Sequence, residues 1–213
     1  MARKSREEAE ATARRILDAA ETVFCEKGVA ATTLHDIAAA AGVTRGAIYG
    51  HFRNKEDLFN RMHERVHLPI EALATEAASD DEPDPLGSLR DLLLRVLEET
   101  AGNAHQRRVL EILFHKCERV PATETLVARQ QALNAQGRER TRRLLANAVA
   151  RGQLPADLDC RRAAIGLHAS ITGLLFDWLL DPHAFDLAAE AAPLVDTWLT
   201  GLATASDLRL GRP

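Results

Sequence analysis

Apolar residues recur at helical spacing through most of this chain, and the sharpest pattern lies near the N-terminus. Within residues 34–41 the apolar side chains stand three and four positions apart, which places them on one face of a helix. Thr33 precedes this stripe as an N-cap, and Asp36 three residues later completes a capping box. Gly42 follows it, and glycine ends helices because it reaches left-handed backbone angles at little cost. The pattern therefore predicts one short helix and a turn.

A second short helix and the start of a third follow that turn. Thr44 is a second N-cap, and the helix that it begins directs Ile48 and Phe52 toward the core. Asn54 can cap the third helix, whose buried stripe runs through residues 58–62. Two short helices joined by a glycine turn have the layout of a helix-turn-helix DNA-binding motif.

Longer apolar stripes predict the remaining helices. One of these precedes the motif, has its apolar face in residues 16–24 and ends at Gly28. An acidic, proline-containing loop at residues 79–87 marks a change in the character of the chain. Further helices are expected in residues 89–102, 107–120, 123–151, 161–180 and 186–204. The sequence has no strand-like alternation, so we predict an all-α fold of about nine helices.

The polar face of the second short helix carries the candidate DNA contacts. Its outward positions are Arg45, Ala47, Tyr49 and His51, with Gly46 and Gly50 between them. Small residues let the backbone approach DNA closely, and Thr, Tyr, His and Lys side chains can donate to phosphate oxygens. Arg45 can pair with a guanine edge or a phosphate, and Lys55 can add a phosphate contact at the start of the third helix. The alternative is an ordinary helical hairpin whose polar face is solvated.

The segment GVTRGAIYGHFRNKEDLF resembles the recognition-helix signature of the TetR family of transcriptional regulators, and the resemblance is specific over about residues 9–69. It implies that operator DNA is contacted by Thr33, Thr44, Arg45, Gly46, Ala47, Tyr49, His51 and Lys55. Gly50 is a departure, because relatives often carry an aromatic residue there. Glycine removes a bulky contact and weakens the helix by up to about 1 kcal/mol. We therefore expect an operator preference that differs from that of close relatives.

Several other segments resemble the repressors of multidrug efflux pumps within that family. They are MARKSREEAEATARRILDAA at the start of the chain, RRVLEILFHKCE at 107–118, NAVARGQLP at 147–155 and DWLLDPHAFDL at 177–187. The resemblance implies a DNA-binding domain at residues 9–69 and a ligand-binding and dimerisation domain at residues 70–213. It also implies a repressor that leaves a palindromic operator when a hydrophobic or aromatic small molecule binds.

The resemblance also implies which residues line the ligand pocket. They are His67, Leu89, Leu92, Leu93, Val96, Leu110, Leu113, Phe114, Gly137, Thr141, His168, Ile171, Thr172 and Phe176. Ligand pockets are mostly apolar with a few polar anchors, and His67, His115 and His168 are candidate anchors. The alternative for each apolar position is an ordinary place in the core, and for each histidine a hydrogen-bonded core position.

The last two predicted helices, residues 161–180 and 186–204, are apolar over more than one face. This suits burial against their own domain and a second subunit at once. Relatives form a four-helix dimer interface from this pair, and a two-fold dimer places two recognition helices about 34–36 Å apart on DNA. We therefore expect a homodimer.

Composition, with three widely spaced cysteines, indicates a protein of the reducing cytoplasm, and charge adds little to this. Residues 1–65 carry 11 Lys and Arg against 10 Asp and Glu, so the DNA-binding part is weakly basic overall. Its cluster of Arg3, Lys4 and Arg6 is either a flexible arm that meets phosphates or a minor groove, or a solvated tail. No apolar run reaches the roughly 18 residues that span a membrane, and no signal peptide opens the chain. We expect no membrane partner and no cofactor.

Two motifs keep other functions open. His63, Glu64 and His67 match the HExxH pattern of zinc peptidases, in which two histidines on one helix face bind zinc and the glutamate acts as general base. No recognisable third ligand follows, so we expect no catalytic residue and no resident metal, although metal sensing is an alternative. Cys25, Cys117 and Cys160 are odd in number and widely spaced. Buried inert thiols are the expected interpretation, and a redox switch is the alternative.

Overall fold

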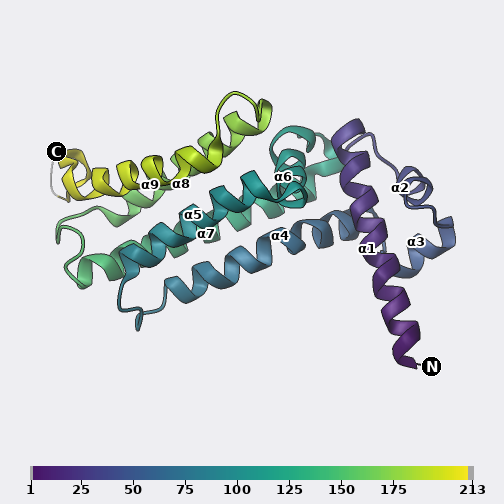
Figure 1. The fold of residues 1–213 in the computed structure, drawn as a ribbon, viewed down its shortest axis with the longest axis horizontal. Helices are drawn as coiled ribbons and strands as arrows, with labels where there is room; N and C mark the ends of the chain where they lie inside the picture. The colour runs from purple at the N-terminus through teal and green to yellow at the C-terminus, as the bar shows by residue number, and fades with distance from the viewer. Residues whose placement is uncertain (1, 211–213) are drawn as a thin grey trace. The chain divides into compact units, whose positions relative to one another are not determined.

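The computed structural model describes the backbone of residues 2–210 and the side chains of residues 6–210 (Figure 1). Over this range the chain forms nine α-helices and no β-strand, which confirms the predicted all-α fold. The α-helices are α1 (Ala2–Lys27), α2 (Leu34–Ala40), α3 (Arg45–His51), α4 (Lys55–Ala77), α5 (Pro85–Gly102), α6 (Ala104–Glu111), α7 (Glu124–Ala150), α8 (Cys160–Leu180) and α9 (Leu187–Thr204). Three short helical turns are η1 (Ile112–Lys116), η2 (Pro121–Thr123) and η3 (Ser206–Leu208).

The helices form two compact units. The first unit comprises Met1–His67 and His105–Arg129, and the second comprises Leu68–Ala104 and Gln130–Pro213. Helices α4 and α7 each contribute residues to both units. The sequence boundary at residue 69 lies beside the first of these crossings, but the first unit also takes in a segment from the middle of the chain.

The helix-turn-helix pair is built on the apolar face of α1, the purple helix in Figure 1. Helix α1 packs against α2, and α2 packs against α3. Ile16 and Phe24 of α1, Ile37 of α2 and Ile48 of α3 are completely buried. The Phe24 ring meets the Phe59 ring of α4 edge to face, with 5.9 Å between the centroids. Burial of each of these side chains stabilises the folded first unit by about 1.5–3 kcal/mol relative to leaving that side chain exposed. Together they hold α3 in place.

A buried carboxylate joins α1 to α4 and α6 within the first unit. Glu21 is completely buried, and its Oε1 lies 2.7 Å from His105 Nδ1. Arg65 approaches Glu21 Oε1 at 3.5 Å and Arg108 approaches Oε2 at 3.4 Å. Loss of a partner from a buried ion pair costs about 3–5 kcal/mol. These three side chains therefore make the burial of Glu21 tolerable.

The second unit is organised around α5 and α9, which pack along each other. Leu89 and Leu97 of α5 and Val195 of α9 are almost fully buried. At the rim of this contact Arg90 Nε and Nη2 donate to the two oxygens of Asp196 at 2.6 and 3.0 Å. A bidentate pair fixes direction as well as charge, so it sets the register between the two helices.

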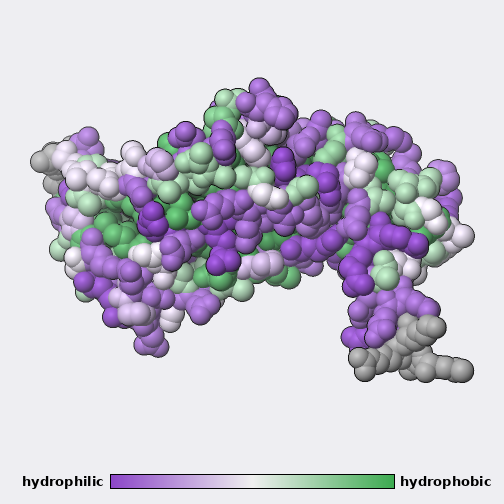
Figure 2. Space-filling model, viewed as in Figure 1, coloured by the Kyte–Doolittle hydropathy of each residue, from purple (hydrophilic) through white to green (hydrophobic). Residues whose placement is uncertain are grey.

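Helix α8 uses only part of its apolar surface inside its own unit. It packs beside α9, and its Leu175 and Trp178 are buried. Trp178 Nε1 donates to the Phe185 carbonyl at 3.2 Å, which closes the α8–α9 connection. Figure 2 shows hydrophobic surface exposed between hydrophilic side chains on the face that it draws. The large apolar side chains that α8 leaves open are Ile165, Phe176 and Leu180, which are 45%, 44% and 63% exposed.

By length and composition alone, α8 could cross a membrane. Arg161, Arg162 and Asp177 interrupt its apolar stretch, so the expectation that no uninterrupted apolar run reaches this length stands. A single helix of this kind is weak evidence for a membrane span, and α8 buries Leu175 and Trp178 inside its own unit.

The N-terminal arm differs from the sequence expectation. Instead of a flexible segment, the backbone from Ala2 onward is part of α1, and Arg6 Nε contacts Glu10 Oε1 at 3.1 Å one helical turn later. The side chains of Arg3 and Lys4 lie outside the described residues.

Two further features were not visible in the hydrophobic pattern. Helix α4 continues through Pro69 to Ala77, so the predicted domain boundary falls inside a helix. Helix α6 ends in η1, a single π-helical turn that packs on α1. Such turns are rare and often mark functional segments.

Candidate nucleic-acid interface

Two caps and a glycine turn fix the position of α3. Thr33 Oγ1 accepts a hydrogen bond from Asp36 N at 3.2 Å, and Asp36 Oδ2 accepts one from Thr33 N at 2.9 Å. Gly42 has a φ of 63°, in the left-handed region that glycine enters without strain. Thr44 Oγ1 accepts from Ala47 N at 3.1 Å and begins α3. The predicted capping box, turn and second cap are all confirmed.

Asp36 also ties the start of α2 to the end of α1. Lys27 Nζ donates to Asp36 Oδ1 at 2.7 Å. This bond, followed by the bonds from Thr33, holds the pKa of the Asp36 carboxyl well below its ordinary value. The carboxylate therefore stays ionised at physiological pH, and the cap stays formed.

Helix α3 buries one side and exposes a cationic, small-residue face. Ile48 is completely buried, whereas the Tyr49 side chain is 50% exposed. The Arg45 guanidinium lies 6.0 Å from the centroid of the Tyr49 ring, within the range of a cation–π contact. Gly46 follows Arg45 and Gly50 follows Tyr49, and neither adds bulk, which leaves the backbone accessible.

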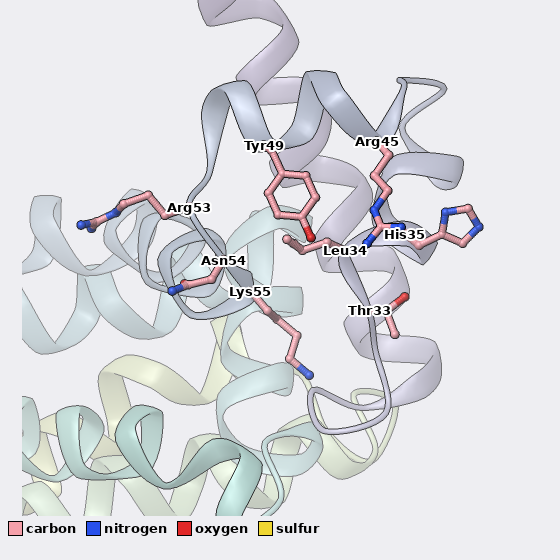
Figure 3. A pocket seen from close by; sticks show the side chains of 8 residues that line it. All are labelled: Thr33, Leu34, His35, Arg45, Tyr49, Arg53, Asn54 and Lys55. Atoms are coloured by element: carbon pink, nitrogen blue, oxygen red, sulfur yellow. The ribbon is translucent and has the colours of Figure 1, made fainter.

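A cleft of about 550 Å³ lies beside this face (Figure 3). Arg45 and Tyr49 project from α3 toward His35 and Leu34 at the start of α2. The lining residues are Thr33, Leu34, His35, Arg45, Tyr49, Arg53, Asn54 and Lys55. The arginine and tyrosine donors gathered on this surface suit the oxygens of a phosphate backbone.

The cleft brings together four of the eight predicted DNA contacts. These are Thr33, Arg45, Tyr49 and Lys55. The other four, Thr44, Gly46, Ala47 and His51, lie on or at the cap of α3 but do not line the cleft. Contact of all eight residues with DNA stays a prediction.

Sequence reasoning missed four lining residues, Leu34, His35, Arg53 and Asn54. Arg53 is the notable omission, since its side chain is 86% exposed and lies in the link between α3 and α4. His35 stands in the first turn of α2, directly after Thr33 and Leu34. A signal was available: each residue lies within two positions of a predicted contact in the sequence, and both Arg53 and His35 can donate to phosphate.

Lys55 is placed differently from the phosphate contact that we expected. Its Nζ donates to the carbonyl oxygens of Val29, Ala30 and Thr32 at 2.7, 3.1 and 2.8 Å. A lysine ammonium has three hydrogens, so these bonds use its full capacity. Partial burial lowers the pKa of Lys55, and Glu118 opposes that effect. In this structure Lys55 binds the protein's own backbone, and its contact with phosphate stays a prediction.

Gly50 leaves open space on α3. A Cβ at this position would meet no atom within 4 Å. The backbone φ of Gly50 is not positive, so any side chain can adopt its conformation. The absence of an aromatic residue here is therefore not imposed by packing within the first unit.

The HExxH motif is occupied by interactions of another kind. Arg129 Nη2 donates to Glu64 Oε1 at 2.7 Å, which takes up the carboxylate that a zinc peptidase would use as a base. Burial lowers the pKa of His63 to about 4, with smaller contributions from His67 and Arg129. Among the described residues, the group of three metal-ligating side chains is Asp18, Glu21 and His105, which includes neither histidine of the motif. These contacts favour a structural role for the motif.

The three cysteines are unpaired thiols in the described residues. Burial raises the pKa of Cys25 to about 11 and also raises the pKa values of Cys117 and Cys160. The thiolate is the reactive form, so these shifts favour inert thiols over a redox switch.

The residues expected to line a ligand pocket are distributed over several helices. Leu89 and Leu93 are buried in α5, and Thr141 Oγ1 donates to the Gly137 carbonyl within α7 at 3.1 Å. On α8, burial and then Arg138 lower the pKa of His168, whereas Phe176 belongs to the exposed stripe rather than to the core. The remaining positions are mostly half-buried: His67, Leu92, Val96, Leu110, Leu113, Phe114, Ile171 and Thr172. A ligand pocket lined by this set stays a prediction.

Comparison with known proteins matches both parts of the chain. Residues 16–62 match the family described as bacterial regulatory proteins, tetR family, and residues 84–204 match the C-terminal region of MAATS-type transcriptional repressors. The regulator TtgR of Pseudomonas putida is 44% identical over 209 residues, which cover 98% of this chain and 100% of TtgR.

Two solved structures have the same architecture. NalD, the secondary repressor of the MexAB-OprM multidrug efflux pump in Pseudomonas aeruginosa, superimposes with a TM-score of 0.81 and 41% identity over 93% of this chain and 99% of NalD. The complex of SmeT with triclosan gives 0.83 and 34% identity over 95% of this chain and 96% of SmeT. SmeT is the repressor of the Stenotrophomonas maltophilia pump SmeDEF.

Proposed function

Because the chain belongs to the tetR family of bacterial regulatory proteins, we propose that it represses a multidrug efflux pump operon and releases its operator when a hydrophobic or aromatic small molecule binds. The observation that carries this proposal is the capped helix α3, which presents Arg45 and Tyr49 on an exposed face beside a cleft of hydrogen-bond donors. The related repressors NalD and SmeT supply the class of target, since both repress multidrug efflux pumps.

The operator is palindromic because the reader works as a pair. A single seven-residue helix offers few base contacts. Two such helices about 34–36 Å apart engage successive major grooves on one side of the duplex. We assign the dimer contact to α8 and α9, because α8 exposes Ile165, Phe176 and Leu180 in one stripe. A second copy of the chain offers the same stripe, so the two can cover each other about a two-fold axis.

The effector belongs to the class of hydrophobic or aromatic compounds. The predicted pocket positions are mainly leucine, valine, isoleucine and phenylalanine, with few charges among them. The complex of the related SmeT with triclosan makes triclosan a suitable first probe.

Repression ends through a shift between two states of the dimer. A ligand that binds better to the state with mismatched reader spacing draws the population toward that state. The coupling free energy is then the difference between the ligand's affinities for the two states, and no chemistry on the ligand is needed. The protein acts in the cytoplasm, where it meets both the operator and the imported compound.

Selection from random-sequence DNA with the purified protein tests this function. We expect enrichment of a palindrome, binding that weakens steeply with added salt, and release of that DNA by triclosan or another aromatic compound. Failure to retain any DNA sequence-specifically at every salt concentration would overturn the proposal. Retention without release by any apolar compound would leave a DNA-binding regulator but reject the drug-responsive mechanism.

A further inference from the structure

The loop between α1 and α2 is held by a segment that lies almost ninety positions later in the sequence. Val29 N donates to the Lys116 carbonyl at 2.8 Å, and Ala30 N donates to Glu118 Oε2 at 3.1 Å. Lys116 is the last residue of the π-helical turn η1, and Glu118 follows two residues later. All of these residues belong to the first unit. A segment outside the N-terminal reader sequence is therefore part of the reader's own scaffold.

The same loop is bound through its carbonyl groups by Lys55. The ammonium of Lys55 accounts for the carbonyls of Val29, Ala30 and Thr32, while Glu118 and Lys116 account for the N–H groups of Ala30 and Val29. The loop thus has a cation on its acceptors and an anion on one of its donors. Glu118 also favours the charged form of Lys55 against the burial that lowers the lysine pKa. We name Lys55 and Glu118 the loop clamp.

Gly28 is fitted to this clamp in two ways. Its φ of 78° is in the left-handed region, where a side chain is strained. In addition, a Cβ at Gly28 would collide with the carboxylate of Glu118. The carboxylate therefore occupies the space next to Gly28 that any other residue would fill.

The loop clamp bears directly on the DNA-facing cleft. The loop ends at Thr33, which caps α2, and both Thr33 and Lys55 line the cleft. On the other side, Glu118 closely follows Leu110, Leu113 and Phe114, which are expected to contact the ligand. A displacement of α6 and η1 would be transmitted through Glu118 and Ala30 to the loop that ends at Thr33.

We propose that Glu118 is a positioning residue for DNA binding, which holds the α1–α2 loop against Lys55 and so sets Thr33 and the cleft in their DNA-competent arrangement. This inference rests on the proposed DNA-binding function and identifies the residue through which η1 acts on the reader. Glu118 touches no DNA in this role.

The test compares Glu118→Ala, Glu118→Gln and a matched control, Glu26→Gln, on the operator fragment selected with the wild-type protein. Glu26 is exposed on α1, and the structure gives it no hydrogen bond or ion pair among the described residues. We expect Glu118→Ala to weaken operator binding about tenfold, as loss of a charge-assisted hydrogen bond would. Glu118→Gln keeps an oxygen that accepts from Ala30 N, so its loss should be smaller, about threefold.

The sign of the effect separates positioning from simple charge. Removal of a negative charge near DNA strengthens binding in general, so Glu26→Gln should leave affinity unchanged or slightly improved. A larger Kd for Glu118→Ala supports the proposal, once stoichiometric titration has determined the fraction of active protein. Faster amide hydrogen exchange at Val29 and Ala30, with α1 and α4 still protected, supports it too.

Two results would overturn the inference. One is a Glu118→Ala protein with wild-type affinity for the operator. The other is an affinity loss that is equal in both Glu118 variants and accompanied by faster exchange throughout the first unit, which indicates general destabilisation. If the wild-type protein itself retains no operator, the proposed function fails with the positioning role, while amide exchange still reports whether the clamp forms.

Discussion

Helices α3 and α8 each expose a face that their own unit does not use, and the two faces are opposite in chemistry. Helix α3 exposes Arg45 and Tyr49, each followed by a glycine, whereas α8 exposes Ile165, Phe176 and Leu180. A cationic face of hydrogen-bond donors is stable in water and also matches a polyanion. An apolar stripe stabilises the protein only when another apolar surface covers it and removes it from water.

This difference teaches how the two partners are recognised. Water already hydrates the charged and polar groups on the exposed face of α3. Binding of a partner there therefore depends on charge attraction, which salt screens, and on geometry. The partner of α8 replaces water, so its binding depends on buried area and tolerates salt. Experiments that exchange these properties test the assignment of DNA to one face and a second subunit to the other.

The largest expected effect comes from a charge on the α8 stripe. In Leu180→Asp the carboxylate would have to be buried in the dimer contact, so we expect monomers at micromolar concentration. Loss of the paired reader should weaken operator binding by about 100-fold or more, because linked half-sites contribute that much avidity. Sedimentation and fluorescence anisotropy measure the two effects. Leu68→Asp, at a leucine of α4 that is 53% exposed, is the matched control and should remain a dimer.

Acid should destabilise the unit that supports α3 through buried His63. Burial keeps the folded-state pKa near 4, below the ordinary value of 6.5. Between these pH values the unfolded chain binds a proton that the folded chain does not, so stability is complete above pH 6.5 and falls toward pH 4. The total loss is up to about 3 kcal/mol. The stability measured by thermal unfolding should no longer fall with pH across this range in His63→Leu, but it should still fall in His183→Gln. An unchanged pH dependence in His63→Leu would contradict the assignment.

Arg45→Ala should weaken specific binding without affecting the dimer. A guanine or phosphate contact by arginine contributes about 1–3 kcal/mol, so we expect a loss of about 10- to 100-fold in operator affinity. Arg95→Ala removes the same charge from the second unit and serves as the control. Equal weakening in both variants would mean that overall charge, and not the face of α3, determines affinity.

The smallest expected effect concerns Gly50 and shows which side chains the exposed face of α3 tolerates. A Cβ at this position meets open space, so Gly50→Ala should stabilise the first unit by about 0.5–1 kcal/mol. Gly42→Ala is the control, because a φ of 63° strains alanine and should destabilise the protein. Denaturant unfolding measures both changes. Gly50→Trp should fold normally and change which bases are enriched in DNA selection.

The helices and their caps followed from local sequence because their causes are local. Thr33, Asp36 and Thr44 form hydrogen bonds to backbone groups three residues away, so the residue types at these spacings predict the caps. Gly42 and Gly28 likewise ended their helices where the apolar stripes ended. The long helices α7, α8 and α9 began and ended close to their predicted limits for the same reason.

Contacts between distant segments could not be predicted in this way. Lys55 was expected to face phosphate, but its partners lie more than twenty residues earlier in the chain. The hydrophobic period of residues 107–120 does not distinguish an α-helix from one that ends in the π-helical turn η1. Glu21 offered a signal, because it shares the α1 face with Ala20 and Phe24, and a charged residue on an apolar stripe requires partners.

The buried carboxylate of Glu21 has a consequence for the order in which the protein can be made. Two of its cationic partners, His105 and Arg108, leave the ribosome more than eighty residues after Glu21 itself. Until they appear, the Glu21 carboxylate has Arg65 beside it but neither His105 nor Arg108. We therefore expect the DNA-reading segment to complete its native contacts only after half of the chain has been synthesised, because a fragment that stops at residue 69 lacks His105, Arg108 and Glu118.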